Sequence, residues 1–518
     1  YILIPMRERQ YYRPEWTCGR FNEEKKVALY YNLIEGVSYF FDSFSAIVVG
    51  KIIKVKRNGV FSLEGLSLES NVSVESLEPF LVQLEQCGLV SSFPITKKGI
   101  LDYRQQLANY KCSQFQKNVT IEEKLPMEHS HAEMLYAQVT GEITSVMFEL
   151  TYRCSEACIH CYNIGATRNN EERSGRAKLI ELTLDEYKRV IDELYEQGLV
   201  KVCLTGGDPF SKSIVWDIMD YLYSKNVVFD VYTNGQSIVN DIERLACYYP
   251  RTVGISLYSG VEKEHDFITR IKGSWDNTMT VIKRLSALAV PLNIKCCVMR
   301  SNLKTYHTIY DIARKYGAVA QMELNITDSI EGDCCARNLR LTPQQLEIVL
   351  RDDNMKLYVG KEAPNYGGQK RDMKVNACGA GETSYCLTPN GDFIPCCSFH
   401  LVFGNVRKQS IADIVTNSDK RKWWSSLILE DYEECGKHDY CDYCNLCVGN
   451  NFVEHGTPLK AGENNCYMAK IRHTLAVKMK GEDYDPLQGR SLLDCLKMLP
   501  EYEPSKLERT YLNNDIER

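Results

Sequence analysis

Six short apolar runs, rich in β-branched residues, recur through the middle of the chain and are separated by stretches of helical pattern. They span Ser145 to Leu150, Leu199 to Leu204, Val227 to Tyr232, Thr252 to Leu257, Pro291 to Met299 and Ala318 to Ile326. Strand-then-helix repetition predicts an α/β fold with a parallel sheet whose crossover helices cover its outer face. Six such units predict a partial barrel at residues 141–340, with its functional loops after the carboxyl ends of the strands.

A cysteine triplet directly follows the first of these runs. Cys154, Cys158 and Cys161 are spaced x3 and x2. A [4Fe–4S] cluster normally takes one thiolate per iron, so three cysteines leave one iron with a free coordination position. A zinc site is the alternative, but structural zinc usually has four ligands in paired sets, and His160 is adjacent to Cys161. The triplet therefore predicts an iron–sulfur cluster that can bind a second molecule.

A glycine-rich segment, Thr205 to Pro209, follows the second run. Gly206 and Gly207 allow a sharp turn and a close approach of the backbone to a ligand. Asp208 beside them can accept charge-assisted hydrogen bonds from an ammonium group. Taken alone the segment is compatible with an ordinary turn, but its place one strand after the triplet favours a ligand site.

The triplet resembles that of the radical S-adenosylmethionine (SAM) superfamily. The resemblance implies that the open iron chelates SAM and that the cluster cleaves it to a 5′-deoxyadenosyl radical. Gly206, Gly207 and Asp208 resemble the superfamily's GGE motif, which grips the SAM amino group, although this chain has Asp in place of Glu. Asn234 and Ser256 fall where the family usually contacts the ribose and carboxylate of SAM, and Tyr162 where it places an aromatic residue near the adenine. An Asn-Gly turn and a buried strand serine are also common without a ligand.

A second group of nine cysteines lies between residues 378 and 466. Cys378, Gly391 and Cys396 have the spacing that opens the SPASM extension, which carries two auxiliary [4Fe–4S] clusters and is common in enzymes that modify peptides. A turn at residues 389–391 suits a hairpin that brings its flanking cysteines together. The later gaps depart from the family, and a zinc ribbon is the alternative for the x2 pair at 441 and 444. The resemblance implies a first auxiliary set and a second, which are Cys378, Cys386, Cys396 and Cys447, and Cys435, Cys441, Cys444 and Cys466.

Cys397 is a further catalytic candidate. Sulfatase maturases that resemble this chain carry an Asp, acting as a base, directly after the residue equivalent to Cys396. A thiol at that position could contact a cluster or the substrate, or it could pack as a small hydrophobic side chain.

Residues 1–110 are expected to form a separate winged-helix-like domain. The patterns predict strands at Ala46 to Val55 and Gly59 to Leu63 and a helix at Val74 to Cys87. The unit resembles the PqqD-like recognition element, which captures the leader of a precursor peptide as an added strand at a sheet edge. A DNA-binding winged helix is the alternative, but the helix has no basic face. The remaining expected divisions are a linker at 111–140, the SPASM domain at 341–475 and a tail at 476–518.

Composition limits the class of protein. The 518 residues are 44% apolar and 25% charged, which indicates a globular chain of several domains. A net charge of −6 without a basic stripe does not indicate nucleic-acid binding, and no apolar run suggests a membrane span. We expect no signal peptide and no disulfides, so the 22 cysteines indicate a reducing cytoplasm, most consistent with an anaerobic bacterium.

These features together predict a radical SAM enzyme, with SAM and three [4Fe–4S] clusters, that modifies a precursor peptide. The preferred product is a thioether from a cysteine sulfur to an α-carbon. Linkage to a β- or γ-carbon and carbon–carbon crosslinking are the alternatives for a peptide substrate. A flavodoxin or ferredoxin is the expected electron donor. The other classes are a sulfatase maturase, a small-molecule radical SAM enzyme and a peptide-binding metalloprotein without catalysis.

Overall fold

The computed structural model describes residues 9–115, 128–163, 180–329, 335–352, 354, 372–481 and 487–504. The strands are β1 (Gln10–Tyr12), β2 (Thr17–Asn22), β3 (Val27–Asn32), β4 (Val37–Asp42), β5 (Val60–Ser62), β6 (Ser145–Glu149), β7 (Lys201–Thr205), β8 (Val228–Thr233), β9 (Thr252–Ser256), β10 (Leu292–Cys297), β11 (Val319–Glu323), β12 (Ser384–Leu387), β13 (Asp392–Ile394) and β14 (Gly404–Asn405). The helices are α1 (Ser43–Lys54), α2 (Leu63–Ser70), α3 (Val74–Gln86), α4 (Lys97–Phe115), α5 (Glu128–Thr140), α6 (Leu184–Glu196), α7 (Val215–Ser224), α8 (Ile242–Cys247), α9 (Glu262–Thr269), α10 (Ser274–Ala287), α11 (Thr308–Lys315), α12 (Pro343–Val349), α14 (Ile411–Asn417), α15 (Asp419–Ser426), α16 (Val448–His455), α17 (Glu463–Gly481) and α18 (Leu492–Met498).

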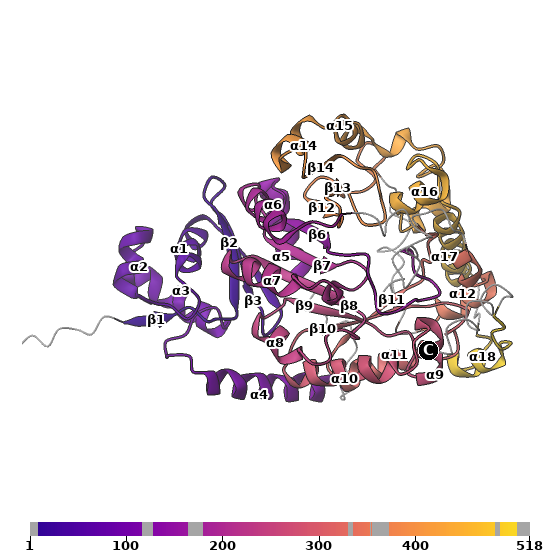
Figure 1. Ribbon diagram of the computed structural model, residues 1–518, viewed down its shortest axis with the longest axis horizontal. Coiled ribbons are helices and arrows are strands. Elements are labelled where there is room, and N and C mark those ends of the chain that lie inside the picture. Colours follow the sequence, from indigo (N-terminus) through magenta and orange to yellow (C-terminus); the bar gives the residue numbers. More distant parts are fainter. Residues whose placement is uncertain are drawn as a thin grey trace, which may run out of the picture.

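A nine-stranded sheet forms the centre of the molecule, in the order β11-β10-β9-β8-β7-β6-β12-β13-β14 (Figure 1). Strands β6 to β11 are parallel and pair in sequence order, so each predicted apolar run supplies one strand of the barrel. The predicted partial barrel of six strand–helix units is confirmed. Helices α6, α7, α8, α10 and α11 come between successive strands along the chain, as parallel crossovers require.

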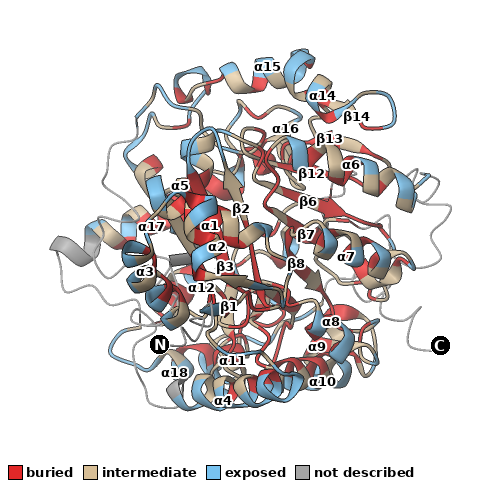
Figure 2. Cartoon of the chain, turned by 90° about the vertical axis from the view of Figure 1, so that its left-hand side faces the viewer, coloured by how far each residue is buried: buried red, intermediate tan, exposed pale blue. Residues whose placement is uncertain are grey.

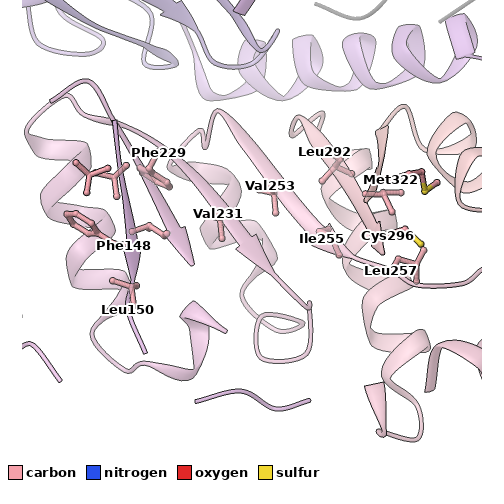
Figure 3. Packing of buried hydrophobic residues seen from close by; sticks show 14 of the residues in the cluster. Phe148, Leu150, Phe229, Val231, Val253, Ile255, Leu257, Leu292, Cys296 and Met322 are labelled. Carbon is pink, nitrogen blue, oxygen red and sulfur yellow. The ribbon is translucent and has the colours of Figure 1, made fainter. Parts of the chain in front are cut away.

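The main core lies between this sheet and the helices on its outer face. Phe148, Val231, Ile255 and Cys296, from four of the strands, belong to one buried cluster (Figure 3). Side chains alternate along a strand. Their neighbours in sequence therefore point to the opposite side, into the barrel. Figure 2 shows the central strands as largely buried between layers that carry the exposed residues.

The SPASM region continues the barrel sheet. Strand β12 pairs in parallel with β6, with Tyr385 opposite Val146, and β12 and β13 form an antiparallel hairpin. At the hairpin tip the Gly391 N–H donates to the Thr388 carbonyl at 3.0 Å, and Gly391 has a φ of 90°, which glycine adopts without strain. The predicted hairpin between the flanking cysteines is confirmed, and one of them, Cys386, lies within β12.

The N-terminal unit contains a three-stranded antiparallel sheet, β2-β3-β4, followed by α1, α2 and α3, and a small β1-β5 pair. The helix predicted at Val74 to Cys87 corresponds to α3, and the strand predicted at Gly59 to Leu63 to β5. The strand predicted at Ala46 to Val55 is wrong, because this run is most of α1. Its buried residues include Ala46, Val49 and Ile52, which lie on one helical face, and this burial outweighs the strand propensity of Val and Ile.

The range expected as a linker, 111–140, contains the end of α4 and all of α5, while 116–127 falls outside the described residues. Helix α5 packs against β3 and β4 through Ala132 and Tyr136, spaced i and i+4 and both buried. Residues 128–140 are therefore a structural helix.

Strand β2 faces loops at the amino ends of the barrel strands. The Cys18 thiol donates to the Asn226 carbonyl at 2.9 Å, and Arg20 Nη2 donates to the Tyr195 carbonyl at 2.7 Å. The N-terminal unit therefore sits at the end of the barrel opposite to the loops after the strands (Figure 1). No described helix combines the length and the hydropathy needed to cross a bilayer.

Candidate active site

The turn after β7 packs directly against the loop that carries the cysteine triplet. The Gly207 N–H donates to the Thr151 carbonyl at 2.7 Å, and the Asp208 N–H donates to the Arg153 carbonyl at 2.9 Å. A Cβ on Gly206 would lie 2.2 Å from the Thr151 oxygen, and one on Gly207 would lie 2.3 Å from the Arg153 oxygen. Gly206 also has a φ of 135°. The glycines are thus required for the contact between the two loops, as well as being available for a ligand.

The three triplet cysteines lie on this loop after β6. Cys154 Sγ accepts from Asn234 Nδ2 at 3.3 Å, and the Cys158 thiol donates to Glu156 Oε2 at 3.3 Å. Burial raises the pKa of all three thiols, and the acidic neighbour Glu156 adds to the effect. Thiolates at this site are costly unless a positive centre neutralises them. A cysteine set of this kind suits an iron–sulfur cluster, whose irons supply that charge.

Glu156, inside the triplet, is a residue that the sequence reasoning missed. Its side chain is buried, and burial raises its pKa to about 8. Gln236 Nε2 donates to Glu156 Oε1 at 3.1 Å, and so links the cluster loop to the loop after β8. An acidic residue between two cysteines is not diagnostic in the sequence, because exposed loops commonly carry acidic residues too.

Asp208 has one carboxylate oxygen available for a ligand. Oδ1 accepts from Thr233 Oγ1 at 2.6 Å, while Oδ2 is buried without a hydrogen-bond partner among the described residues. Burial raises the pKa of Asp208, and the Thr233 hydroxyl partly offsets this. A buried acceptor with no donor is costly. The SAM ammonium, which the resemblance assigns to this residue, fits it.

The other predicted SAM contacts surround the same loop ends. Asn234 donates to Ser155 Oγ at 3.2 Å as well as to Cys154. Ser256 is the last residue of β9 and lies beside Lys295 of β10 in the sheet register. The Tyr162 hydroxyl donates to Glu149 Oε1 at 3.4 Å. The structure thus brings all three residues to the strand ends.

The first auxiliary set is centred on Cys396. Burial raises the pKa of Cys378, Cys386 and Cys447, and the charge of Cys396 adds a smaller increase to each. The neighbouring Cys397 thiol lowers the pKa of Cys396. The assignment of these four thiols to one cluster stays a prediction.

The second auxiliary set lines a single pocket. Cys435, Cys441, Cys444 and Cys466 share its wall with apolar residues that include Leu446, Ala461 and Ala469. No Lys, Arg, Asp or Glu is among the residues that line it. Four thiols around one apolar pocket provide the number and type of ligands that a [4Fe–4S] cluster takes.

Cys397 lies next to Cys396 and is also close to residues of the barrel. It influences the pKa of Tyr162, Tyr232 and Lys295, whose side chains belong to the cluster loop, β8 and β10. Glu149 at the end of β6 in turn raises the pKa of Cys397, after the larger effects of Cys396 and burial. Cys397 is thus within the barrel interior. There the thiol could pack as a small hydrophobic side chain, or it could contact the substrate.

A cavity of about 480 Å³, here called the central cavity, lies between the cluster loop and the SPASM region. Its lining includes His160 and Tyr162 from the cluster loop, Glu323 at the end of β11, and Ser398 and Cys447 from the SPASM region. Burial raises the pKa of Glu323. A molecule in this cavity would touch the triplet loop on one side and a cysteine of the first auxiliary set on the other.

Comparison with known proteins identifies two domain families in the chain. A model of the radical SAM superfamily matches residues 148–311, and a model of the SPASM iron–sulfur cluster-binding domain matches residues 378–448. The antilisterial bacteriocin subtilosin biosynthesis protein AlbA of Bacillus subtilis is 28% identical over 306 residues, which cover 58% of this chain and 66% of AlbA, just under two thirds of its length.

The AdoMet-dependent heme synthase of Methanosarcina barkeri is 26% identical over 331 residues, covering 59% of this chain and 90% of that protein. Among solved structures, Streptococcus suis SuiB bound to precursor peptide SuiA has a TM-score of 0.53 at 14% identity and covers 88% of this chain and 99% of SuiB. SuiB therefore shares the fold. The chain therefore carries a radical SAM domain at residues 148–311 and a SPASM domain at residues 378–448, and uses SAM and [4Fe–4S] clusters.

Proposed function

We propose that the protein is a maturase of a ribosomally synthesised precursor peptide and forms intramolecular thioethers from a cysteine sulfur to an α-carbon. The observation that carries the proposal is the central cavity, which the triplet loop and Cys447 line together. A peptide there would lie between the site of hydrogen abstraction and a second iron–sulfur centre. Similarity to AlbA, named for the biosynthesis of a bacteriocin, supports a peptide substrate.

The residue roles in this proposal follow the cysteine groups and the strand ends. Bound SAM and the reduced triplet cluster would supply a 5′-deoxyadenosyl radical, which removes hydrogen from a substrate carbon. Asp208 Oδ2 accepts from the SAM ammonium, and Gly206 and Gly207 fix the triplet loop beside it. The remaining contacts to SAM come from Tyr162, Asn234 and Ser256.

Three [4Fe–4S] clusters are proposed, one on the triplet and one on each auxiliary set. Formation of a thioether removes one hydrogen atom from the substrate carbon. It also releases the proton of the substrate thiol and one electron. The hydrogen atom goes to the deoxyadenosyl radical, and the electron needs an acceptor, for which an auxiliary cluster is available. An external flavodoxin or ferredoxin would return an electron to the triplet cluster.

The N-terminal unit is proposed to capture the leader of the precursor at strand β4. This strand is one edge of the β2-β3-β4 sheet. The other edge strand, β2, contacts the barrel. Next to it, Phe80 of α3 makes edge-to-face contacts with Phe41 and Phe44, at ring-centroid distances of 6.2 and 6.0 Å, and Phe44 is 52% exposed. A strand edge beside an exposed aromatic ring suits a peptide that adds as a strand.

Two other chemistries remain for a peptide substrate, namely carbon–carbon crosslinking and thioethers to a β- or γ-carbon. A small-molecule substrate is favoured by the similarity to a heme synthase. A small-molecule substrate gives the N-terminal unit no role in recognition. A sulfatase maturase would lack its base, since Cys397 stands where those enzymes have Asp. A metalloprotein that binds peptides without catalysis gives no role to the orphaned oxygen of Asp208.

Mass spectrometry of the treated precursor tests the proposal. The precursor is incubated with reconstituted enzyme, SAM and reductant, then alkylated and weighed. Each thioether should lower the mass by about 2 Da and protect one thiol from alkylation, because alkylation needs a free thiol. Loss of mass with every thiol still reactive would instead indicate a carbon–carbon crosslink. SAM cleavage that leaves every candidate peptide unchanged would overturn the peptide function itself.

A further inference from the structure

Lys295 is a positively charged residue inside the barrel. It lies in β10, where buried and half-buried residues alternate. Ile294 and Cys296 pack into the core under the helices, so Lys295 and Cys297 point to the other side, into the barrel. Gln321 lies opposite Lys295 on β11, and both Gln321 and Cys297 line the central cavity.

A glycine on the neighbouring strand holds the lysine in place. Lys295 Nζ lies 3.3 Å from the centroid of the Tyr232 ring on β8. Gly254 of β9 lies between them, and a Cβ there would be 2.7 Å from Tyr232 Cδ1 and 2.8 Å from Lys295 Cε. Glycine weakens a strand interior and commonly marks a close approach. Here it allows the aliphatic part of the lysine to cross β9 and reach the aromatic ring.

The ammonium has no anionic partner in the described part of the chain. Lys295 makes no ion pair or hydrogen bond there, and its Nζ lies over the Tyr232 ring. Asp230 is nearby but is held by Arg251, whose Nε donates to Oδ1 at 2.8 Å and whose Nη2 pairs with Oδ2. Glu323 at the cavity wall accepts from the Asn325 N–H at 2.7 Å.

An ammonium without a counter-ion in the protein interior is unfavourable, and burial accordingly lowers the pKa of Lys295. A cation–π contact recovers only part of the lost hydration. A ligand carboxylate would remove the remaining cost by adding a charge-assisted hydrogen bond. The interior of the barrel is therefore arranged to receive an anion.

The position of the ammonium separates it from the proposed SAM contacts. Asn234 follows β8, and Ser256 is the last residue of β9. Tyr232 and Gly254 lie opposite each other two residues earlier in these strands, nearer their amino ends. The lysine side chain extends toward the amino ends of the strands to reach the Tyr232 ring. Its neighbours there are Cys203 of β7 and Cys397 of the SPASM region.

We propose that Lys295 binds a carboxylate of the peptide substrate, from either an acidic side chain near the modified residue or the peptide's C-terminus. The inference rests on the proposed peptide function and adds that the modified segment is anionic. Lys295 is thus a residue that determines specificity, while Tyr232 and Gly254 position its ammonium. A peptide without a carboxylate at the right place would bind weakly.

The test uses three labelled pentapeptides and the reconstituted enzyme with SAM under anaerobic conditions. One carries Glu and a C-terminal amide, one carries Gln and a free C-terminus, and the neutral one carries Gln and an amide. Fluorescence anisotropy gives each affinity. Wild type should bind at least one carboxylate peptide about tenfold more tightly than the neutral peptide, and which of the two it prefers identifies the source of the carboxylate.

Lys295→Met should remove that preference and leave the melting temperature unchanged or higher, since a buried charge is lost. Gly254→Ala, which pushes the lysine off the ring, should reduce the preference by a second route. Lys283→Met, at an exposed position on α10, should keep it. Equal binding of all three peptides by wild type would overturn the inference, as would a preference that survives in Lys295→Met.

Two further outcomes separate this inference from its basis. Weaker binding of SAM by Lys295→Met, with the peptide preference intact, would assign the ammonium to the SAM carboxylate and overturn the inference. Failure of wild type to bind any of the peptides would also overturn it. Only if wild type in addition leaves every precursor unmodified while it cleaves SAM does the proposed peptide function fall as well.

Discussion

Gly207→Ala should displace the cluster loop. The new Cβ would lie 2.3 Å from the Arg153 carbonyl oxygen and 2.7 Å from the Tyr152 oxygen. Both partners are backbone atoms, so neither can rotate away, and the loop carrying Cys154 has to move by about 1 Å. A displacement of this size costs on the order of a hundredfold in rate when it misplaces reacting groups. It would also strain the hydrogen bond from the Asp208 N–H to the Arg153 carbonyl.

The assay combines iron content with the rate of 5′-deoxyadenosine formation. If each of the three proposed clusters holds about four irons, the variant should lose roughly four of about twelve, and SAM cleavage should fall by about a hundredfold.

Gly141→Ala is the matched control, because this glycine has a φ of 66° but a Cβ there would meet no atom within 4 Å. It should cost about 1 kcal/mol of backbone strain and leave iron content unchanged. Wild-type iron content and SAM cleavage in Gly207→Ala would refute the packing role of the glycine.

Three further variants test other parts of the molecule. Asp208→Ala should weaken SAM binding by about tenfold or more with unchanged iron content, since it removes a charge-assisted bond of roughly 1.5 to 3 kcal/mol; an unchanged dissociation constant would make the turn purely structural. Phe80→Ala should weaken leader binding to the N-terminal unit, whereas Phe93→Ala, at a 74% exposed position, should not; equal affinities by calorimetry would exclude a role of Phe80 in leader capture. Glu133→Gln should cost roughly 3 kcal/mol, because Glu133 pairs with Lys201 at 2.5 Å and Arg251 at 3.2 Å. Burial raises the pKa of Glu133, but these cations outweigh it and the net pKa is lowered, so the stabilisation is present above the unfolded pKa of about 4.3 and is lost as the pH falls through the folded value. Wild type and variant should differ in urea unfolding at pH 7 and converge in acid; equal stability at pH 7 would contradict the pairing.

The barrel could be predicted because its signals are local. Each strand is a short apolar run bounded by polar turns, and the triplet and the glycine pair each lie within a few residues of a strand end. Parallel topology then brings those ends to one edge without further information. For the same reason the assembly of Asp208 near Cys154 followed from sequence order.

The rest of the site depends on contacts between distant segments. Cys397 reaches the barrel interior because β12 pairs with β6, and the sequence contains no signal for that register. Lys295 looks like any polar residue in an alternating strand until Gly254 and Tyr232 are seen beside it. The sequence of α1 predicted a strand because Val and Ile favour strands. Its helical conformation depends instead on the packing of its buried face within the N-terminal core.

The proposed capture of the leader at β4 would impose a length on the substrate. The N-terminal unit contacts loops at the amino ends of the strands, and the central cavity opens at their carboxyl ends, next to Tyr162 and Glu323. Strands of about five residues are roughly 17 Å long. A peptide held at β4 must cover at least that distance to reach the cavity, which takes about five extended residues. A precursor in which fewer residues separate the captured leader from the modified residue would therefore bind to the enzyme and remain unmodified.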